Sequence, residues 1–275
     1  MLDKITKLTG KQNIVLVRGG GDLGSGIIHR LHRCGFNVVV SELPKPLVIR
    51  REVAYATALE RGNLTIEGVT ARAVVLDSYC AVLRDGDIPV LTEDYQLLLG
   101  RLEPVAVIDA TLRKAACDTK INDAPIVIGI GPGFECAKNT HAIVETKRGH
   151  YLGAVYCSGS AIANTGEPGN IGGYTSERVL RAPITGYLQP VANIGDHVFA
   201  GNVVANCDDH LVVATIDGVV RGMISPQIVQ SGVKIADIDP RGEITYCFSI
   251  SEKARAIAGG ALEALMYLAK IYERN

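Results

Sequence analysis

The fold of this chain is decided by one stretch, Asn13-Ile14-Val15-Leu16-Val17-Arg18-Gly19-Gly20-Gly21-Asp22-Leu23-Gly24. A short β-branched run ends in three glycines and leads into Ser25–Cys34, where apolar residues recur at helical spacing. Gly35 ends that helical pattern, and Phe36–Val40 forms a second apolar run. A strand, a glycine turn, a helix and a second strand in this order predict a βαβ unit with parallel strands.

The glycines of this turn match the pattern Gly-x-Gly-x-x-Gly through Gly19, Gly21 and Gly24. In such a turn the first glycine permits the tight bend, the second lets the backbone approach a pyrophosphate, and the third allows helix–strand contact. The helix N-terminus adds N–H groups and a partial positive charge. We therefore predict that the turn binds a nucleotide or dinucleotide. The alternative is a turn that keeps this shape and binds nothing.

Two carboxylates accompany the turn. Glu42 follows the second predicted strand, where an acid accepts the ribose hydroxyls of adenosine and disfavours a 2′-phosphate. Glu42 would thus select NAD over NADP if the ligand is a nicotinamide dinucleotide. Asp22 lies inside the turn, and we expect it to cap the helix because Asp is a preferred N-cap residue.

Strand-like and helix-like segments continue to alternate up to about residue 135, which predicts a doubly wound sheet. The segment Leu64–Leu76 alternates around Gly68 and is typical of an inserted hairpin. The other segments are a predicted helix at Arg50–Arg61, strands at Ile88–Leu91, Val105–Asp109 and Ile126–Ile130, and a helix at Tyr95–Leu102.

Further candidate ligand contacts follow two of these strands. Gly131 belongs to a second glycine-rich turn, which is either another close-approach loop for a ligand or a plain chain reversal. Asp109 ends its strand at the same predicted sheet edge. Arg113 and Lys114 come next and would meet an anionic ligand, although a solvated face is the favoured interpretation.

The composition changes after residue 138. Thr140–Thr146 and Tyr151–Tyr156 predict a hairpin, in which even spacing puts His141 and Glu145 on one side of a strand. That placement permits a general acid/base pair, or with His150 part of a metal site, but ordinary strand residues are the favoured interpretation. We predict no metal site. Of the seven cysteines, Cys157 and Cys117 are the candidate reactive thiols, and burial is the better prediction for each.

Residues 179–240 contain an internal repeat, in which Ala182–Leu188 aligns with Ala214–Val220 at an offset of 32 residues. Two similar half-units of short strands predict a pseudo-symmetric β-sandwich that resembles a biotinyl/lipoyl-type barrel-sandwich domain. Such carriers present a modifiable lysine on the hairpin between the halves. The corresponding Val204–Leu211 contains no lysine, so a swinging-arm role is not expected. Residues 158–176 form a long Gly/Ser/Asn/Thr-rich loop, which is typical of a functional or disordered segment.

These patterns predict an α/β protein with three parts. A Rossmann-like doubly wound parallel sheet is expected over residues 1–138, and a β-rich, barrel-sandwich-like domain over 139–248. A C-terminal helix over 249–275, capped by Ser251, is expected to pack back on the domains.

Bulk composition excludes several classes of partner. The net charge is −1 and no block of Lys and Arg is present, so we expect no nucleic-acid partner. No apolar window is long enough for a membrane span, and the first residues do not resemble a signal peptide. The scattered cysteines lack the spacing of a disulfide framework or a zinc knuckle. A cytoplasmic protein is therefore expected.

The sequence also resembles the accessory family of the selenium-dependent molybdenum hydroxylase system called YqeB. The resemblance rests most on Gly172-Gly173-Tyr174-Thr175-Ser176-Glu177-Arg178-Val179-Leu180-Arg181-Ala182-Pro183, and also on Val17–Leu23 and Ile128–Phe134. It implies a role in maturing a molybdenum hydroxylase that carries a labile selenium. The implied partners are that hydroxylase or its cofactor-assembly proteins, and the implied ligand is a nucleotide form of the molybdenum cofactor. No catalytic residue is implied.

Three functional hypotheses remain open from the sequence. The first is the accessory or maturation protein that binds a nucleotide or the nucleotide form of the cofactor. The second is an NAD-dependent oxidoreductase, and the third is a non-catalytic, nucleotide-binding scaffold that docks other proteins. Whether the chain forms a homo-oligomer is also left open.

Overall fold

The computed structural model describes residues 13–112, 118–164, 166 and 168–272. The chain divides into two compact units. The first takes in the described residues up to Pro46, then Ala54–Asn164 and those from Ile250 onward. The second takes in Leu47–Val53 and the later described residues up to Ser249.

A nine-stranded sheet forms the frame of the first unit in the described residues, with the strand order β3-β4-β5-β2-β1-β6-β7-β8-β9. The central strand β1 (Ile14–Arg18) pairs in parallel with β2 on one side and with β6 on the other. The chain therefore builds outward from β1 in one direction, then returns to its other side. The remaining strands are β2 (Asn37–Ser41), β3 (Asn63–Ile66), β4 (Val69–Ala73), β5 (Ile88–Leu91), β6 (Ala106–Asp109), β7 (Ile126–Ile130), β8 (Ala142–Val144) and β9 (Val155–Tyr156).

Two antiparallel hairpins complete the sheet at its edges, and both fall where the sequence predicted hairpins. The strands β3 and β4 pair across a turn at Glu67 and Gly68. The strands β8 and β9 pair at the other edge, where β8 also pairs in parallel with β7. Residues 139–164, which the sequence analysis assigned to the second domain, therefore extend the large sheet of the first unit.

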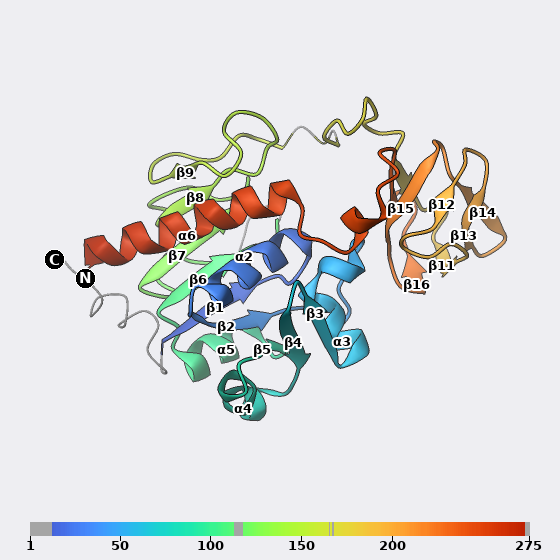
Figure 1. Cartoon of the computed structure of the whole chain (residues 1–275). Helices are drawn as coiled ribbons and strands as arrows, with labels where there is room; N and C mark the ends of the chain where they lie inside the picture. Colours follow the sequence, from blue (N-terminus) through green and yellow to red (C-terminus); the bar gives the residue numbers. More distant parts are fainter. Residues whose placement is uncertain (1–12, 113–117, 165, 167, 273–275) are drawn as a thin grey trace. The chain divides into compact units, whose positions relative to one another are not determined.

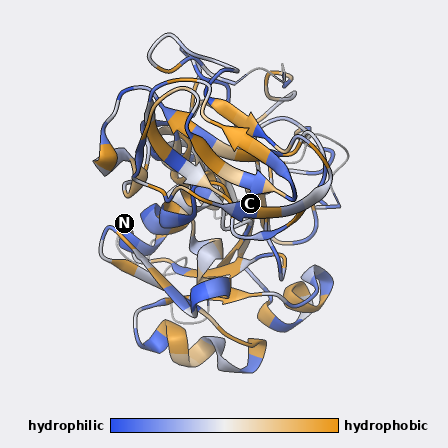
Figure 2. Ribbon diagram, turned by 90° about the vertical axis from the view of Figure 1, so that its right-hand side faces the viewer, coloured by the Kyte–Doolittle hydropathy of each residue, from blue (hydrophilic) through white to orange (hydrophobic). Residues whose placement is uncertain are grey.

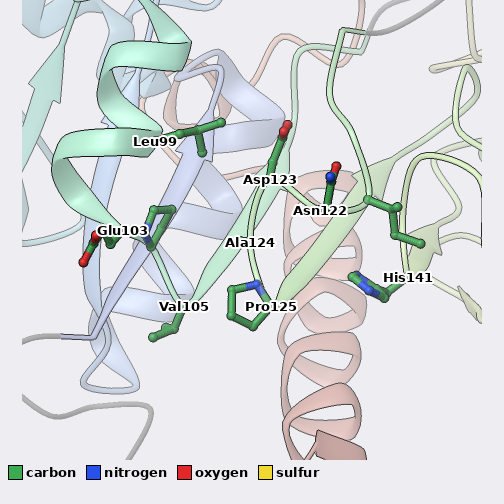
Figure 3. A pocket seen from close by; sticks show the side chains of 10 residues that line it. Leu99, Glu103, Val105, Asn122, Asp123, Ala124, Pro125 and His141 are labelled. Atoms are coloured by element: carbon green, nitrogen blue, oxygen red, sulfur yellow. The ribbon is translucent and has the colours of Figure 1, made fainter.

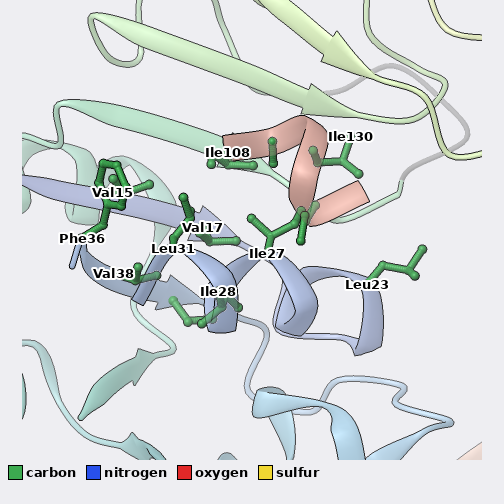
Figure 4. Packing of buried hydrophobic residues seen from close by; sticks show 14 of the residues in the cluster. Val15, Val17, Leu23, Ile27, Ile28, Leu31, Phe36, Val38, Ile108 and Ile130 are labelled. Atoms are coloured by element: carbon green, nitrogen blue, oxygen red, sulfur yellow. The ribbon is translucent and has the colours of Figure 1, made fainter. Parts of the chain in front are cut away.

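Helices cover both faces of this sheet. The helices α2 (Asp22–Arg33) and α6 (Glu252–Tyr272) lie side by side on one face, as Figure 1 shows. Their apolar residues pack on Val15 and Val17, the inward-facing alternate residues of β1 (Figure 4). The opposite face carries Leu16 and packs on α5 (Tyr95–Leu102) and α4 (Tyr79–Arg84). In Figure 2 the helices carry both hydrophobic and hydrophilic stretches, as expected where one side of a helix is buried.

The helix predicted over Arg50–Arg61 is broken into short pieces. Two 3₁₀ turns at Arg51–Val53 and Tyr55–Thr57 precede the four-residue helix α3 (Ala58–Arg61). Ala54 between the turns is extended, with φ −131° and ψ 112°, so a continuous helix cannot form.

The second unit contains two four-stranded antiparallel sheets, β10-β17-β15-β12 and β14-β13-β11-β16. The strand orders correspond one to one when β10, β11, β12 and β13 are matched with β14, β15, β16 and β17, as the repeat of about 32 residues requires. One apolar core is shared by both sheets. The strands are β10 (Val179–Arg181), β11 (Gly186–Pro190), β12 (His197–Val198), β13 (Val203–Cys207), β14 (His210–Val213), β15 (Gly218–Met223), β16 (Gln227–Val229) and β17 (Lys234–Asp239).

The protein is therefore a mixed α/β protein with a large sheet that contains parallel strands, two further antiparallel sheets and a C-terminal helix. Within the described part of the chain, no helix combines the length and apolar character needed to cross a bilayer.

Candidate functional site

The glycine turn between β1 and α2 leaves no room for a side chain at Gly19, Gly20 or Gly24, and at Gly20 a Cβ would lie 2.9 Å from the backbone nitrogen of Ala56. Gly19 has φ +93°, and a Cβ added there would lie 3.0 Å from the carbonyl oxygen of Ala110. A Cβ added at Gly24 would lie 2.1 Å from the carbonyl oxygen of Gly19. The first turn of α2 therefore packs directly on the backbone of the turn, which is the close helix–strand contact predicted for the third glycine.

Gly21 differs, because a Cβ added there would meet no atom of the described residues within 4 Å. Gly21 is the N-cap of α2, with φ −64° and ψ 178°, and no side chain caps the helix there. Asp22, which we predicted as the cap, is instead the first helical residue, since Gly21 already has the extended geometry of that position. The start of α2 therefore faces open space with an uncapped helix N-terminus.

Hydrogen bonds hold the middle of the turn in place. The Gly20 N–H donates to Glu42 Oε2 at 2.7 Å, and the Gly20 carbonyl oxygen accepts from Ala56 N at 2.9 Å. Ser25 Oγ donates to the same carbonyl oxygen at 3.0 Å. The turn is thus preorganised by three separate segments of the chain.

Glu42 has a role that the sequence did not indicate. Its Oε1 accepts a hydrogen bond from Leu43 N at 2.7 Å, while Oε2 holds Gly20, so the half-buried carboxylate supports the turn itself. Each carboxylate oxygen has a second lone pair. Glu42 therefore keeps acceptor capacity for a hydroxyl group beside the turn.

A buried ion pair closes the sheet edge where β1 and β6 end. Arg18 NH1 lies 3.2 Å from Asp109 Oδ2, and Thr119 Oγ1 donates to the same carboxylate oxygen at 2.6 Å. The Arg18 guanidinium stacks 3.6 Å from the centre of the Tyr95 ring on the α5 side of the sheet. Thr111 N and Oγ1 bond to Asp109 Oδ1, so both carboxylate oxygens are engaged. This network seals the α5 side, and the uncapped helix lies on the other side. Arg113, Lys114 and Cys117 lie outside the described residues.

The first turns of α2 and α6 lie in contact. A Cβ added at Gly26 would be 2.8 Å from the Ala254 Cβ, and Gly259 lies against Arg30 one turn later, so the two helices run parallel. Ser251 Oγ accepts a hydrogen bond from Ala254 N at 3.2 Å, as predicted for the N-cap. Both helix N-termini therefore point toward the sheet edge that carries the glycine turn.

Lys253 in the first turn of α6 is the residue that sequence reasoning missed. Burial lowers its pKa and the charge of Arg148 adds to this, while the carboxylates of Asp22 and Glu145 act in the opposite direction. A cation is unfavourable at a helix N-terminus. Its presence two residues after the cap Ser251, in the first turn of the helix, is the sequence signal that would have singled it out.

Gly131 directly follows β7 at the same sheet edge, and its contacts are with the chain itself. Its φ is +85°, its N–H donates to the Val144 carbonyl oxygen at 2.8 Å, and a Cβ there would lie 2.7 Å from Thr146 Oγ1. The space beside Gly131 is filled by the chain itself. This geometry favours the chain-reversal interpretation over a ligand contact.

The structure does not bring His141 and Glu145 together, although they share one side of a strand. They flank β8 at opposite ends, and four residues of strand span about 13 Å. Glu145 is fully buried and accepts hydrogen bonds from Thr146 N, Lys147 N and Ile162 N at 2.7–2.8 Å. The Glu145 carboxylate therefore holds together the loop after β8 and the loop around Ile162. It does not form an acid/base pair with His141.

His141 lies at the amino edge of the sheet. Its Nδ1 accepts a hydrogen bond from Val127 N at 3.0 Å, and burial lowers the pKa of the ring. His150 lies in the β8–β9 turn, with its ring edge-on to Tyr151. Across the described chain, no group of three His, Cys, Asp or Glu side chains is placed to hold a metal ion.

A pocket at the amino edge of the same sheet includes His141 (Figure 3). It precedes β6 and β7 and therefore lies at the opposite end of the strands from the glycine turn. The pocket measures about 750 Å³. Its lining residues are Leu99, Glu103, Pro104, Val105, Ile121, Asn122, Asp123, Ala124, Pro125 and His141.

Cys157 is exposed after β9, and Cys136 is buried beside the same segment. Cys136 Sγ lies 3.3 Å from the Tyr156 carbonyl oxygen, and burial together with the nearby Cys157 raises its pKa. The favoured prediction that Cys157 is buried was therefore wrong, and this candidate reactive thiol is accessible.

Comparison with known proteins links the chain to one curated relative. No protein-family model matches it. The chain is 46% identical over 257 residues to "Uncharacterized protein YqeB" of Escherichia coli (strain K12), an alignment that covers 93% of this chain and 48% of that protein. This similarity supports the predicted relationship to the YqeB family. The chain spans about half the length of that relative.

Solved structures give only weak likenesses. An aspartoacylase family protein of Mesorhizobium loti is 13% identical, with 82% of this chain and 84% of that one covered and a TM-score of 0.25. The product-bound ectoine utilization protein EutE (DoeB) of Ruegeria pomeroyi is 10% identical, with 82% and 56% covered and a TM-score of 0.24. At these TM-scores the likenesses carry no argument about fold or function.

Proposed function

We propose that this chain binds a nucleotide or dinucleotide at the glycine turn, with the phosphates against the N-terminus of α2. The observation that carries the proposal is that the three glycines of the motif differ in their steric surroundings. Gly19 and Gly24 are required by backbone contacts, whereas no described atom would meet a Cβ at Gly21 and no side chain among the described residues caps the helix there. A glycine with no steric need of its own is explained by a ligand that must approach the backbone.

The strand order of the large sheet supports a Rossmann-like interpretation. Counting only β1, β2, β5, β6, β7 and β8 in chain order, the spatial order is 3-2-1-4-5-6. The order reverses at β1 and β6, and the glycine turn follows β1 at that point. Ligands of open α/β sheets bind at such a reversal, outside the carboxyl ends of the strands.

The charges around the turn suit a phosphate. The N-termini of α2 and α6 each add a partial positive charge, and Lys253 lies in the first turn of α6. An anionic ligand would also compensate the partly buried ammonium group of Lys253, whose pKa burial lowers. We therefore assign Lys253 to phosphate binding and Glu42 to the ribose hydroxyls.

For the biological role, we propose an accessory or maturation protein of a selenium-dependent molybdenum hydroxylase system. This role rests on the sequence resemblance alone, and the likeness to the uncharacterised Escherichia coli protein supports only the relationship to the YqeB family. The ligand would then be a nucleotide form of the molybdenum cofactor, and the partner the hydroxylase or its assembly proteins. The separation of His141 from Glu145 makes the oxidoreductase hypothesis the weaker one, because these two residues were the acid/base pair that the sequence offered for it.

The ligand proposal is tested by thermal unfolding with a panel of NAD, NADP, ADP, CDP, CTP and a molybdopterin dinucleotide. A ligand at 100 times its Kd should stabilise the protein by about 2.7 kcal/mol. Gly21→Val should abolish this stabilisation. Gly100→Val is the matched control, because Gly100 is exposed and a Cβ there also meets no atom. Stabilisation that survives Gly21→Val, or no response to any member of the panel, would refute the site.

The identity of the preferred base separates the functional hypotheses. A cytidine preference supports the cofactor-handling role, whereas NAD preference together with hydride transfer to a substrate supports an oxidoreductase. Co-purification with a molybdenum hydroxylase tests the partner directly. A failure to associate with such an enzyme or its cofactor would contradict the accessory role.

A further inference from the structure

The outer face of the sheet β10-β17-β15-β12 in the second unit carries a buried cluster of charges. Ala236 and Ile238 of β17 point into the apolar core, so Asp237 and Asp239 lie on the other face. Both carboxylates are at least 96% buried. Charged side chains are rarely buried to this extent unless they are paired, so the pairing in this cluster decides its chemistry.

Both carboxylates accept hydrogen bonds from cationic side chains. Arg178 NH1 bonds to Asp237 Oδ1 at 2.5 Å, and Lys234 Nζ lies 3.1 Å from the same oxygen. Arg241 makes a two-pronged contact with Asp239, with Nε 2.9 Å from Oδ1 and NH2 2.6 Å from Oδ2. Both oxygens of Asp239 and one oxygen of Asp237 are therefore already engaged by cations other than Arg221.

Arg221 is left without an adequate partner. It is only 6% exposed and lies at a β-bulge between Val220 and Gly222. Its only ion pair within the described residues is 3.4 Å long, from NH1 to Asp239 Oδ2, and its buried Nε has no hydrogen-bond partner there. A buried guanidinium with an unsatisfied donor is costly, and such a group calls for a partner that the chain itself does not supply.

The cluster also has too little negative charge. Arg50 is buried nearby, donating to the carbonyl oxygens of Tyr246 and Ser249 at 2.8 and 3.1 Å. Burial and then the charge of Arg50 lower the pKa of Arg221 against the opposing effect of Asp239. Among the described residues, five cations surround the two carboxylates Asp237 and Asp239, and they are Arg50, Arg178, Arg221, Lys234 and Arg241.

We propose that this cluster is an anion site, in which Arg221 and Arg241 hold a small oxyanion of the phosphate or sulfate class. Guanidinium groups recognise such anions through paired N–H donors. The side chains of Arg241 and Lys234 are each 34% exposed, so the site opens to solvent at their end of the cluster. An anion there would supply the missing partner of Arg221 and neutralise part of the excess charge. The site lies in the second unit and is separate from the glycine turn.

Calorimetric titration of the full chain with inorganic phosphate, in a phosphate-free and sulfate-free buffer, tests this site. We expect one saturable site in the wild-type chain, weakened roughly tenfold or more by Arg221→Met. Arg181→Met is the matched control, because Arg181 is an exposed arginine on strand β10 of the same sheet. The Arg181→Met variant should bind phosphate as tightly as the wild-type chain. Gly21→Val should also leave phosphate binding unchanged, which separates this site from the proposed nucleotide site.

Two results would overturn the anion site. One is the absence of saturable phosphate binding to the wild-type chain, and the other is equal binding by Arg221→Met. If Arg221→Met does not fold, Arg241→Gln at the exposed end of the cluster replaces it, with the same expected loss. Titration with glycerol 3-phosphate distinguishes the source of the anion, because tighter Arg221-dependent binding than that of inorganic phosphate would assign the site to a phosphate monoester.

Discussion

The two ends of the large sheet offer opposite kinds of site. The amino end has the visible hollow, the pocket that includes His141 and Asn122 (Figure 3). The carboxyl end has the glycine turn, two helix N-termini and Lys253. The pocket is lined by aliphatic side chains, prolines and a few polar side chains. The carboxyl end of the sheet instead brings together backbone N–H donors and positive charge.

This difference shows that the shape of a surface and its chemistry can point to different places. A phosphate needs N–H donors and positive potential more than it needs a deep hollow, because the interaction is electrostatic. We therefore propose that the nucleotide binds at the carboxyl end. The predictions below separate the two ends, beginning with the largest expected effect.

The largest effect is expected at Gly24. Gly24→Ala puts a Cβ 2.1 Å from the Gly19 carbonyl oxygen, and neither backbone segment can move without disturbing the sheet. We expect a loss of about 3 kcal/mol in the free energy of unfolding, measured by chemical denaturation. Gly100→Ala is the control, and an equal effect of the two substitutions would contradict the close contact.

Lys253→Met should weaken nucleotide binding while leaving the fold intact. The substitution keeps the length of the partly buried side chain and removes only its charge. We expect roughly a tenfold increase in Kd, measured by calorimetry, as for the loss of one charge-assisted contact. Unchanged affinity would remove Lys253 from the phosphate site.

The pH dependence of binding gives a related test. Burial lowers the pKa of Lys253 below the 10.5 of an exposed lysine. The lysine is charged below this lowered pKa and neutral above it, so nucleotide affinity should fall as the pH rises through it. The unfolded chain binds more protons than the folded chain between the two pKa values, so the Lys253 contribution to stability should rise with pH there. Both slopes should disappear in Lys253→Met, measured by titrations over the alkaline range.

The smallest effect is expected at the amino end. Asn122 is exposed in the pocket lining, and Asn122→Ala should change the free energy of unfolding by no more than about 0.5 kcal/mol. Its nucleotide affinity should equal that of the wild-type chain. A clear loss of affinity would move the ligand to the pocket.

Local sequence pattern predicted the features that depend on near neighbours. The βαβ unit, the tight bend at Gly19 and the close helix contact at Gly24 followed from the spacing of the glycines, because turn geometry and helix starts are short-range properties. The repeat of about 32 residues likewise matches the one-to-one strand order of the two small sheets. The Asp22 cap was predicted wrongly, because the neighbouring Gly21 takes that position.

Contacts between distant segments could not be predicted. The strand β8 joins the large sheet through β7, which no local pattern records, so the boundary expected at residue 138 differs from the observed division. Lys253 comes beside the turn only because α6 packs on Gly26. Arg221 faces carboxylates that lie 16 and 18 residues later in the chain, at positions set by a β-bulge.

Amide hydrogen exchange with and without the best ligand of the nucleotide panel tests the central claim most directly. The account predicts that the ligand slows exchange in residues 19–25 and at the start of α6, with no change in residues 121–125. Slowed exchange in residues 121–125 without an effect on residues 19–25 would contradict it and place the ligand in the pocket at the amino end.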